Sequence, residues 1–117
     1  MRYLCVYKSE RDASAPPTQD EITKMGRLIG EMTQAGVLLT TEGCKSSKHG
    51  ARLTIENGKI TVKDGPFTEA KEFIGGLAMI KVNSKAEAIE WTKRFLSVVG
   101  SGVSEILEIN EPFVPSA

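Results

Sequence analysis

Hydrophobic and polar positions along the first part of the chain alternate and then recur with a helical period. The alternation over residues 2–8 predicts a strand that is buried on at least one face. Residues 19–35 carry apolar side chains at spacings of three and four, which predicts an amphipathic helix. The apolar stripe of this helix is Ile22, Met25, Ile29 and Met32, with Leu28 at its flank. Thr18 and Glu21 have the spacing of a capping box at its start, and Gly36 supplies its end.

The middle of the chain has the pattern of a strand followed by a hairpin. Residues 37–40 are a short apolar run that predicts a second strand, after which the chain is polar and basic. Residues 51–56 and 59–63 alternate on either side of Asn57-Gly58. This pair readily adopts the positive φ angles of a type I′ turn, so the segment predicts a β-hairpin.

The last part of the chain predicts a strand, a helix and a final strand. Residues 73–82 are almost wholly apolar, which is typical of a central strand, and Gly75-Gly76 inside it indicates a bulge or a close backbone approach. Residues 85–98 follow a second capping box and recur with helical spacing. Residues 103–110 predict the last strand.

The order of these elements predicts an α+β fold. Without the hairpin it is βαββαβ, the order of a ferredoxin-like sandwich, so the hairpin would be an insertion. Two right-handed crossovers place both helices on one face of an antiparallel sheet. The other face stays open, although its strands are apolar on both sides. We therefore expect a homodimer that buries the open sheet face under two-fold symmetry.

Length, charge and composition narrow the class of protein. A chain of 117 residues and 12.7 kDa predicts a single domain over residues 1–117. It lacks both an apolar stretch of about 20 residues and a signal-peptide pattern, so we expect a cytoplasmic protein without membrane contact. Fifteen basic and fifteen acidic residues give a formal net charge of zero, so the molecule has no overall positive potential to attract the phosphates of a nucleic acid. We therefore expect no direct nucleic-acid binding.

The residue types present also argue against a cofactor. Two cysteines and one histidine form no zinc-ligand pattern, and no phosphate-binding glycine motif is present. We therefore expect neither a metal nor another cofactor. In a reducing cytosol, Cys5 and Cys44 are expected to stay free of a disulfide.

Four residues near the predicted hairpin carry the candidate chemistry. Asp64 is interpreted either as a general acid or base, if a pocket desolvates it, or as the residue that starts a tight turn. Arg52 stands on a strand, and its planar guanidinium suits a carboxylate or phosphate. Phe67 would wall a pocket. His49, the only imidazole, is interpreted either as a solvated side chain or as part of a group that binds an anion.

The segment around Asp64 carries a resemblance to a known family. Asp64-Gly65-Pro66-Phe67, followed by acidic and Lys-Glu residues and by Ile74-Gly75-Gly76, resembles the signature of the DGPF group of the YCII-related family. Similar residues stand at Ala35-Gly36-Val37-Leu38, Glu42-Gly43, Gly50-Ala51-Arg52 and Ala88-Ile89-Glu90-Trp91, so the resemblance covers most of the chain. It implies a ferredoxin-like fold that dimerises through its sheets into an α+β barrel.

The resemblance implies less about activity. The DGPF group is largely uncharacterised, and its members often lie near genes for alternative sigma factors. A related YCII branch is linked to the removal of chloride from a hydroxylated aromatic, with a His and an Asp as acid and base. Asp64 matches that Asp, but the stretch that would hold the His reads Thr-Lys-Met-Gly-Arg over residues 23–27. The last strand ends in Glu108-Ile109-Asn110, where the group tends to have Glu-x-Arg.

Two functions follow from these residues. The first is a homodimeric small-molecule-binding module, with a regulatory role, whose cleft is walled by Phe67, Phe73 and strand residues and holds a small anionic or aromatic ligand. The alternative is a cofactor-independent lyase or isomerase in which Asp64 moves a proton and Arg52 holds an anion. The missing His favours the binding module, and whether the protein is an enzyme stays open.

Overall fold

The structure, a computed structural model, describes residues 1–12 and 16–111. Within these residues the elements are β1 (Arg2–Ser9), α1 (Gln19–Gln34), β2 (Leu38–Gly43), the short 3-10 helix η1 (Ser47–His49), β3 (Ala51–Glu56), β4 (Lys59–Asp64), β5 (Phe73–Lys81), α2 (Lys85–Val99) and β6 (Val103–Glu108). None of the described helices is long and apolar enough to cross a membrane.

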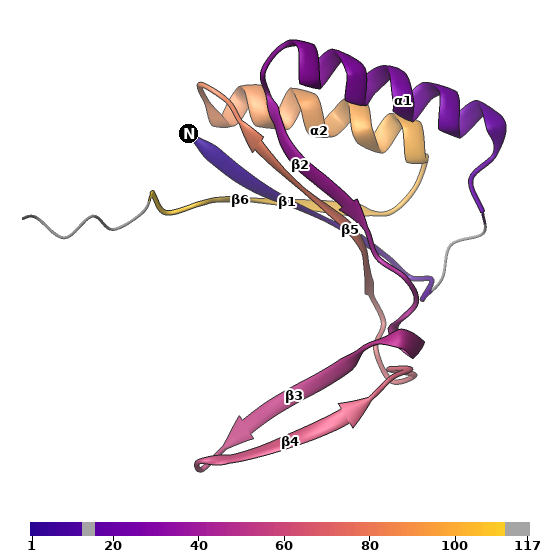
Figure 1. The fold of residues 1–117 in the computed structure, drawn as a ribbon, viewed down its shortest axis with the longest axis vertical. Helices are drawn as coiled ribbons and strands as arrows, with labels where there is room; N and C mark the ends of the chain where they lie inside the picture. Colours follow the sequence, from indigo (N-terminus) through magenta and orange to yellow (C-terminus); the bar gives the residue numbers. More distant parts are fainter. Residues whose placement is uncertain (13–15, 112–117) are drawn as a thin grey trace, which may run out of the picture.

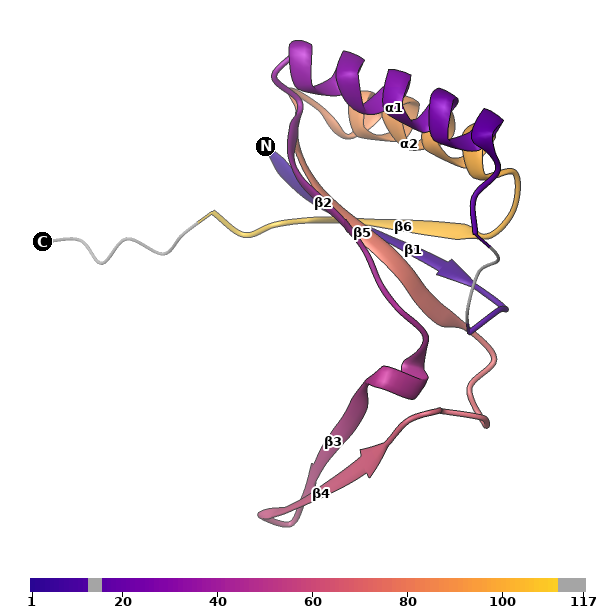
Figure 2. The same cartoon turned by 45° about the vertical axis from the view of Figure 1, so that its right-hand side comes forward.

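Four of the strands form one antiparallel sheet in the order β2-β5-β1-β6. Both helices lie on one face of this sheet (Figures 1 and 2). The fold is therefore α+β and is compatible with a ferredoxin-like fold. The predicted central strand is confirmed, because β5 pairs with both β1 and β2. The predicted bulge is confirmed as well: the β1–β5 register shifts between Tyr7 and Lys8, which leaves Gly75 without a Cα partner on β1.

The start of α1 forms as predicted, and the predicted stripe faces the core except at Ile22. The Glu21 amide donates to Thr18 Oγ1 (3.1 Å), and the reciprocal contact of the capping box is present. Leu28, expected at the flank, is buried, whereas Ile22 is half exposed. The expectation that Ile22 belongs to the buried stripe is wrong, because the N-terminal end of α1 stands away from the sheet (Figure 2).

The buried core lies at one end of the helix-sheet sandwich. Its members are Tyr3, Leu28, Met32, Val37, Ile80, Val82 and Ala88. These residues come from the start of β1, the second half of α1, the residue before β2, the end of β5 with the residue after it, and the start of α2, which all meet at that end. The sandwich is thus a wedge that is closed by the core and widens toward the start of α1 (Figure 1).

The strands β3 and β4 form a separate two-stranded sheet, which we call the arm (residues 51–64). Asn57 and Gly58 have φ angles of 49° and 77°, so the predicted turn with positive φ angles is confirmed. The arm projects away from the helices and the main sheet (Figure 1). The radius of gyration is accordingly 16.7 Å, whereas a compact chain of this length would have about 13 Å.

Candidate functional site

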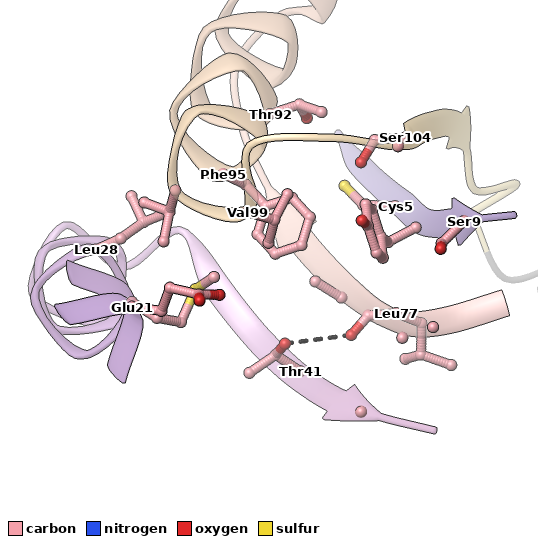
Figure 3. A pocket seen from close by; sticks show the side chains of 18 of the residues that line it. Cys5, Ser9, Glu21, Leu28, Thr41, Leu77, Thr92, Phe95, Val99 and Ser104 are labelled. Carbon is pink, nitrogen blue, oxygen red and sulfur yellow. Dashed lines mark hydrogen bonds between the residues drawn. The ribbon is translucent and has the colours of Figure 1, made fainter. Parts of the chain in front are cut away.

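An open cavity of about 1350 Å³ lies between the two helices and the sheet, in the wide part of the wedge. Phe95 and Val99 of α2 line it from one side and Cys5 from the sheet, and the buried Leu28 of α1 lies where the cavity meets the core (Figure 3). Most of the lining is apolar. A mainly apolar cavity with a few polar groups is the usual form of a small-molecule site.

The floor of the cavity follows from the register of β1 and β5. Alternate residues of a strand share a face, so Tyr3, Cys5 and Tyr7 of β1 point toward the helices together with their partners on β5. Opposite Tyr3 stands the large Ile80, which belongs to the core, whereas Cys5 pairs with the small Ala78. Because these side chains are small, space remains between the sheet and the helices in the wide part of the wedge.

Tyr7 forms an aromatic wall that the sequence analysis missed. Its ring meets the ring of Phe95 edge-on, with the centroids 5.4 Å apart, and its hydroxyl donates to the Ser101 carbonyl (2.7 Å). A Cβ at Gly102 would lie 2.6 Å from the Tyr7 ring, and one at Gly75 would lie 3.0 Å from it. Gly75 and Gly102 were the only signal of this wall in the sequence. Because neither has a side chain, both leave space for the Tyr7 ring.

Cys5, Thr41 and Thr92 are uncharged polar groups of the cavity. Burial raises the pKa of the Cys5 thiol, and the Thr92 hydroxyl opposes this rise in part. A thiol with a raised pKa is protonated at neutral pH and is a poor nucleophile. The hydroxyls of Thr92 and Thr41 donate to the carbonyls of Ala88 (2.8 Å) and Leu77 (3.2 Å), so their free capacity is to accept hydrogen bonds.

The charged residues of the lining carry an excess of negative charge. The carboxylates are Glu10, Glu21, Glu42 and Glu72, and the cations are Lys8 and Arg11. Lys8 is already paired, with its Nζ 2.9 Å from Glu105 Oε1, and this pair raises the pKa of Lys8. The register turns the side chains of Lys8 and Glu42 to the sheet face opposite the helices, as it does those of Leu4 and Val6. Among the other charged residues of the lining, three carboxylates outnumber Arg11, which favours a neutral or cationic ligand over an anion.

The base of the arm is a second cluster of polar contacts, built on Ser47 of η1. The Ser47 amide and hydroxyl donate to the carboxylate of Asp12 (2.7 and 2.5 Å), and these bonds, chiefly the one from the hydroxyl, lower the pKa of Asp12. Ser47 Oγ also accepts from the Phe67 amide (3.0 Å), while the Gly65 amide donates to the Gly50 carbonyl (2.9 Å). These bonds hold the turn after β4 against η1.

Arg52 and Lys63, neighbours across the arm, hold one carboxylate between them. Glu69 Oε1 lies 2.8 Å from Arg52 Nη1 and 2.6 Å from Lys63 Nζ. These bonds, first the one from Lys63, lower the pKa of Glu69 to about 2. The Arg52 guanidinium also lies over the Phe67 ring, 4.4 Å from its centroid. Arg52 is thus held by an ion pair and by an aromatic ring, while the two cations and one carboxylate of this cluster keep a net charge of +1.

A known protein-family model matches nearly the whole chain. The model of the YCII-related domain matches residues 1–112. The chain belongs to the YCII-related family. The matched residues include every described strand and helix, so the cavity and the arm are both parts of the YCII-related domain. A comparison with curated protein sequences gives no match.

The four residues singled out from the sequence all lie at the arm of this YCII-related domain. Arg52 and Phe67 contact each other, Asp64 is exposed at the end of β4, and His49 is exposed at the end of η1. None of the four lines the cavity, and neither does Phe73, which was expected to wall the cleft. The β3–β4 hairpin carries them away from the helices. Their roles in binding and catalysis stay predictions.

The bridge made by Glu69 leads to a prediction about the base of the arm. In Glu69→Gln the neutral amide no longer attracts two cations, so we expect the arm amides to exchange hydrogen roughly two to five times faster at neutral pH. Because the pKa of Glu69 lies below its ordinary value of 4.5, at about 2, the stabilisation is complete at neutral pH and is lost as the pH falls from about 4.5 toward 2.

Amide-resolved hydrogen exchange at neutral pH and an NMR titration from pH 6 to pH 2 measure these two effects. Glu56→Gln is the matched control, because Glu56 stands near the tip of the arm and makes no ion pair among the residues that the structure describes. Equal exchange rates in the two variants, or an acid transition of the arm that persists in Glu69→Gln, would show that the bridge does not hold the arm.

Proposed function

We propose that this chain is a homodimeric module that binds a small, uncharged, aromatic or apolar molecule in the cavity between the helices and the sheet. The observation that carries the proposal is the cavity itself, about 1350 Å³ in volume and mainly apolar. This open cavity is larger than the about 300–1000 Å³ usual for small-molecule sites, but like them it combines apolar walls with a few polar groups. Cys5, Thr41 and Thr92 are such groups here.

The walls and the charges of the cavity specify the class of ligand. The rings of Tyr7, Trp91 and Phe95 offer faces and edges to an aromatic molecule. The excess of carboxylates in the lining opposes an anion. Of the anionic and aromatic ligands that the sequence analysis left open, we therefore propose the aromatic one. Release of water from the apolar walls would drive its binding.

A cofactor-independent lyase or isomerase is the alternative proposal. It depends on Asp64, which is exposed and lies outside the cavity, and on Arg52, which is bound to Glu69 and also lies outside the cavity. Inside the cavity, the Cys5 thiol has a raised pKa. The binding module needs only groups that line the cavity, which is why we prefer it.

We further propose that two copies pair through the open face of the main sheet into an α+β barrel. The register places one set of apolar side chains on the face opposite the helices: Leu4, Val6, Ile74, Met79, Val103 and Leu107. Ile74, Val103 and Leu107 are each about half exposed (54%, 48% and 55%). The ion pair of Lys8 and Glu105, the partners of Val103 and Val6, lies on the same face. A second copy would bury the apolar side chains around this pair, and two-fold symmetry would close the contact.

Within the YCII-related family we assign the chain to the DGPF group. The support is the segment Asp64-Gly65-Pro66-Phe67 together with its place in the fold. Gly65 approaches the Ser47 carbonyl so closely that a Cβ would collide with it, and the Phe67 amide donates to Ser47 Oγ. This segment therefore has a structural role at the base of the arm, whichever function the protein has.

Binding of a neutral aromatic dye tests the proposed function. N-phenyl-1-naphthylamine should bind with a rise in fluorescence, and Ala78→Phe, which fills the floor of the cavity, should weaken binding by about tenfold or more. Asp64→Asn is the control, because Asp64 lies outside the cavity, and it should change the affinity less than about twofold. Fluorescence titration measures both affinities, and circular dichroism checks that each variant is folded.

Two outcomes would overturn the proposal. A folded Ala78→Phe variant that binds the dye as well as the original protein would place the dye outside the cavity. Loss of binding in Asp64→Asn would return the site to the turn after β4 and favour the alternative. The anionic dye 8-anilinonaphthalene-1-sulfonate should bind more weakly than the neutral dye at low salt, because carboxylates predominate in the lining.

A further inference from the structure

The arm has one apolar face that nothing in the described chain covers. Leu53 stands opposite Val62 and Ile55 opposite Ile60, so the four side chains share one face. Their exposed fractions are 65% for Leu53, 66% for Ile55, 62% for Ile60 and 63% for Val62. The other face carries the polar and charged side chains Arg52, Thr54, Glu56, Lys59, Thr61 and Lys63. The arm is thus amphipathic without a core of its own to face.

A hairpin in this situation needs a surface to pack on. Every residue of β3 and of β4 is exposed. An isolated two-stranded hairpin is only marginally stable in water, and a row of four large apolar side chains adds to the surface that water must solvate. Contiguous exposed apolar surface of this kind marks a contact site.

The base of the arm holds this face in a defined direction. Ser47 binds both Asp12 and the Phe67 amide, and Glu69 joins Arg52 to Lys63. In both views the arm extends to the side of the main sheet that the helices do not cover (Figures 1 and 2). The arm and the open sheet face therefore border the same side of the molecule.

We propose that the apolar face of the arm packs on a second copy of this chain, so that each subunit of the homodimer holds the other with its arm. This inference rests on the proposed homodimer. A body seated on the open sheet face would lie beside the arm, and a six-residue strand spans about 20 Å, enough to reach well over a neighbouring subunit. Two-fold symmetry makes the contact reciprocal, so that one arrangement buries both arms and both sheet faces.

Paired substitutions on the two faces of the arm test this inference. In the full-length protein, Leu53→Asn and Ile60→Asn should each raise the dissociation constant of the dimer about tenfold or more, because they place an amide in the apolar contact. Thr54→Asn and Thr61→Asn lie on the opposite face of the same strands and should change it less than about threefold. Sedimentation equilibrium over a range of concentrations measures all five proteins. These positions are exposed in the single chain, so the core should stay folded.

The outcomes distinguish a failure of the proposed arm contact from a failure of the proposed homodimer. A wild-type protein that stays near 12.7 kDa at all concentrations overturns the proposed homodimer and the arm contact with it. A wild-type dimer that Leu53→Asn and Ile60→Asn leave unchanged overturns the arm contact alone. Mixed dimers of a methyl-labelled and an unlabelled subunit provide a second readout. Nuclear Overhauser contacts from the Leu53 and Ile60 methyls to the unlabelled subunit are expected, and contacts within one subunit only would also overturn it.

Discussion

Replacement of Leu28 by alanine should lower the free energy of unfolding by about 3 kcal/mol, the middle of the range for a buried leucine. Leu28 is 2% exposed and packs in the closed end of the wedge, where the surrounding side chains cannot collapse into the space that it leaves. Ile22 has a similar size, lies on the same helix and was expected on the buried stripe, yet it is 50% exposed. Ile22→Ala should therefore cost about 1 kcal/mol or less.

Urea unfolding of both variants at one fixed protein concentration measures this difference, because the stability of a dimer depends on concentration. The comparison tests the wedge directly. If Ile22→Ala cost as much as Leu28→Ala, the N-terminal end of α1 would be packed on the sheet in solution. The cavity would then be closed, and the proposed binding site would be lost with it.

The second large effect is expected at Gly65, where the chain turns at the base of the arm. A Cβ at this position would lie 1.6 Å from the Ser47 carbonyl oxygen and 2.5 Å from its carbon, so the backbone itself must move in Gly65→Ala. Overpacking against backbone costs up to about 3 kcal/mol, which corresponds to roughly hundredfold faster hydrogen exchange where the contact opens. The Phe67 amide, which donates to Ser47 Oγ, should show this change.

Gly50→Ala is the matched control for this experiment. Gly50 accepts the hydrogen bond of the Gly65 amide, but a Cβ at Gly50 would be 3.5 Å from the same Ser47 oxygen, an ordinary contact. Its φ of −117° suits any residue. We therefore expect less than about threefold faster exchange at Phe67 in this variant. Similar effects of the two substitutions would mean that the close approach to Ser47 does not hold the arm.

Elements that depend on neighbouring residues could be predicted, and their bounds agree closely with the structure. The capping box of Thr18 and Glu21 places the start of α1 at residue 19, because both partners lie within one turn. The same holds for Asn57-Gly58, whose positive φ angles form the turn between β3 and β4. The second strand was predicted over residues 37–40, whereas β2 runs from Leu38 to Gly43, because its length is set by pairing with β5.

The candidate site could be predicted only in its parts. Arg52 and Phe67 were named, and they do meet, but Glu69 and Asp12, which complete the two clusters at the arm, were not. Asp12 lies 35 positions from Ser47 in the chain, and no local pattern relates the two residues. The cavity was missed because Trp91 and Phe95 have the spacing of core residues, and spacing does not reveal whether a helix touches the sheet along its whole length.

By itself, the sequence determined the family, the order of strands and helices, the caps of α1 and the hairpin turn, and it marked Gly75-Gly76 as the place of a bulge or a close backbone approach. These features depend on residue types at short spacings, where backbone conformation and hydrogen bonding are local. Only the tertiary structure decided the angle between the helices and the sheet, and with it the cavity. Tyr3 and Ile80 fill the closed end, whereas the smaller Cys5 and Ala78 follow them toward the cavity, and these residues meet only once the chain has folded.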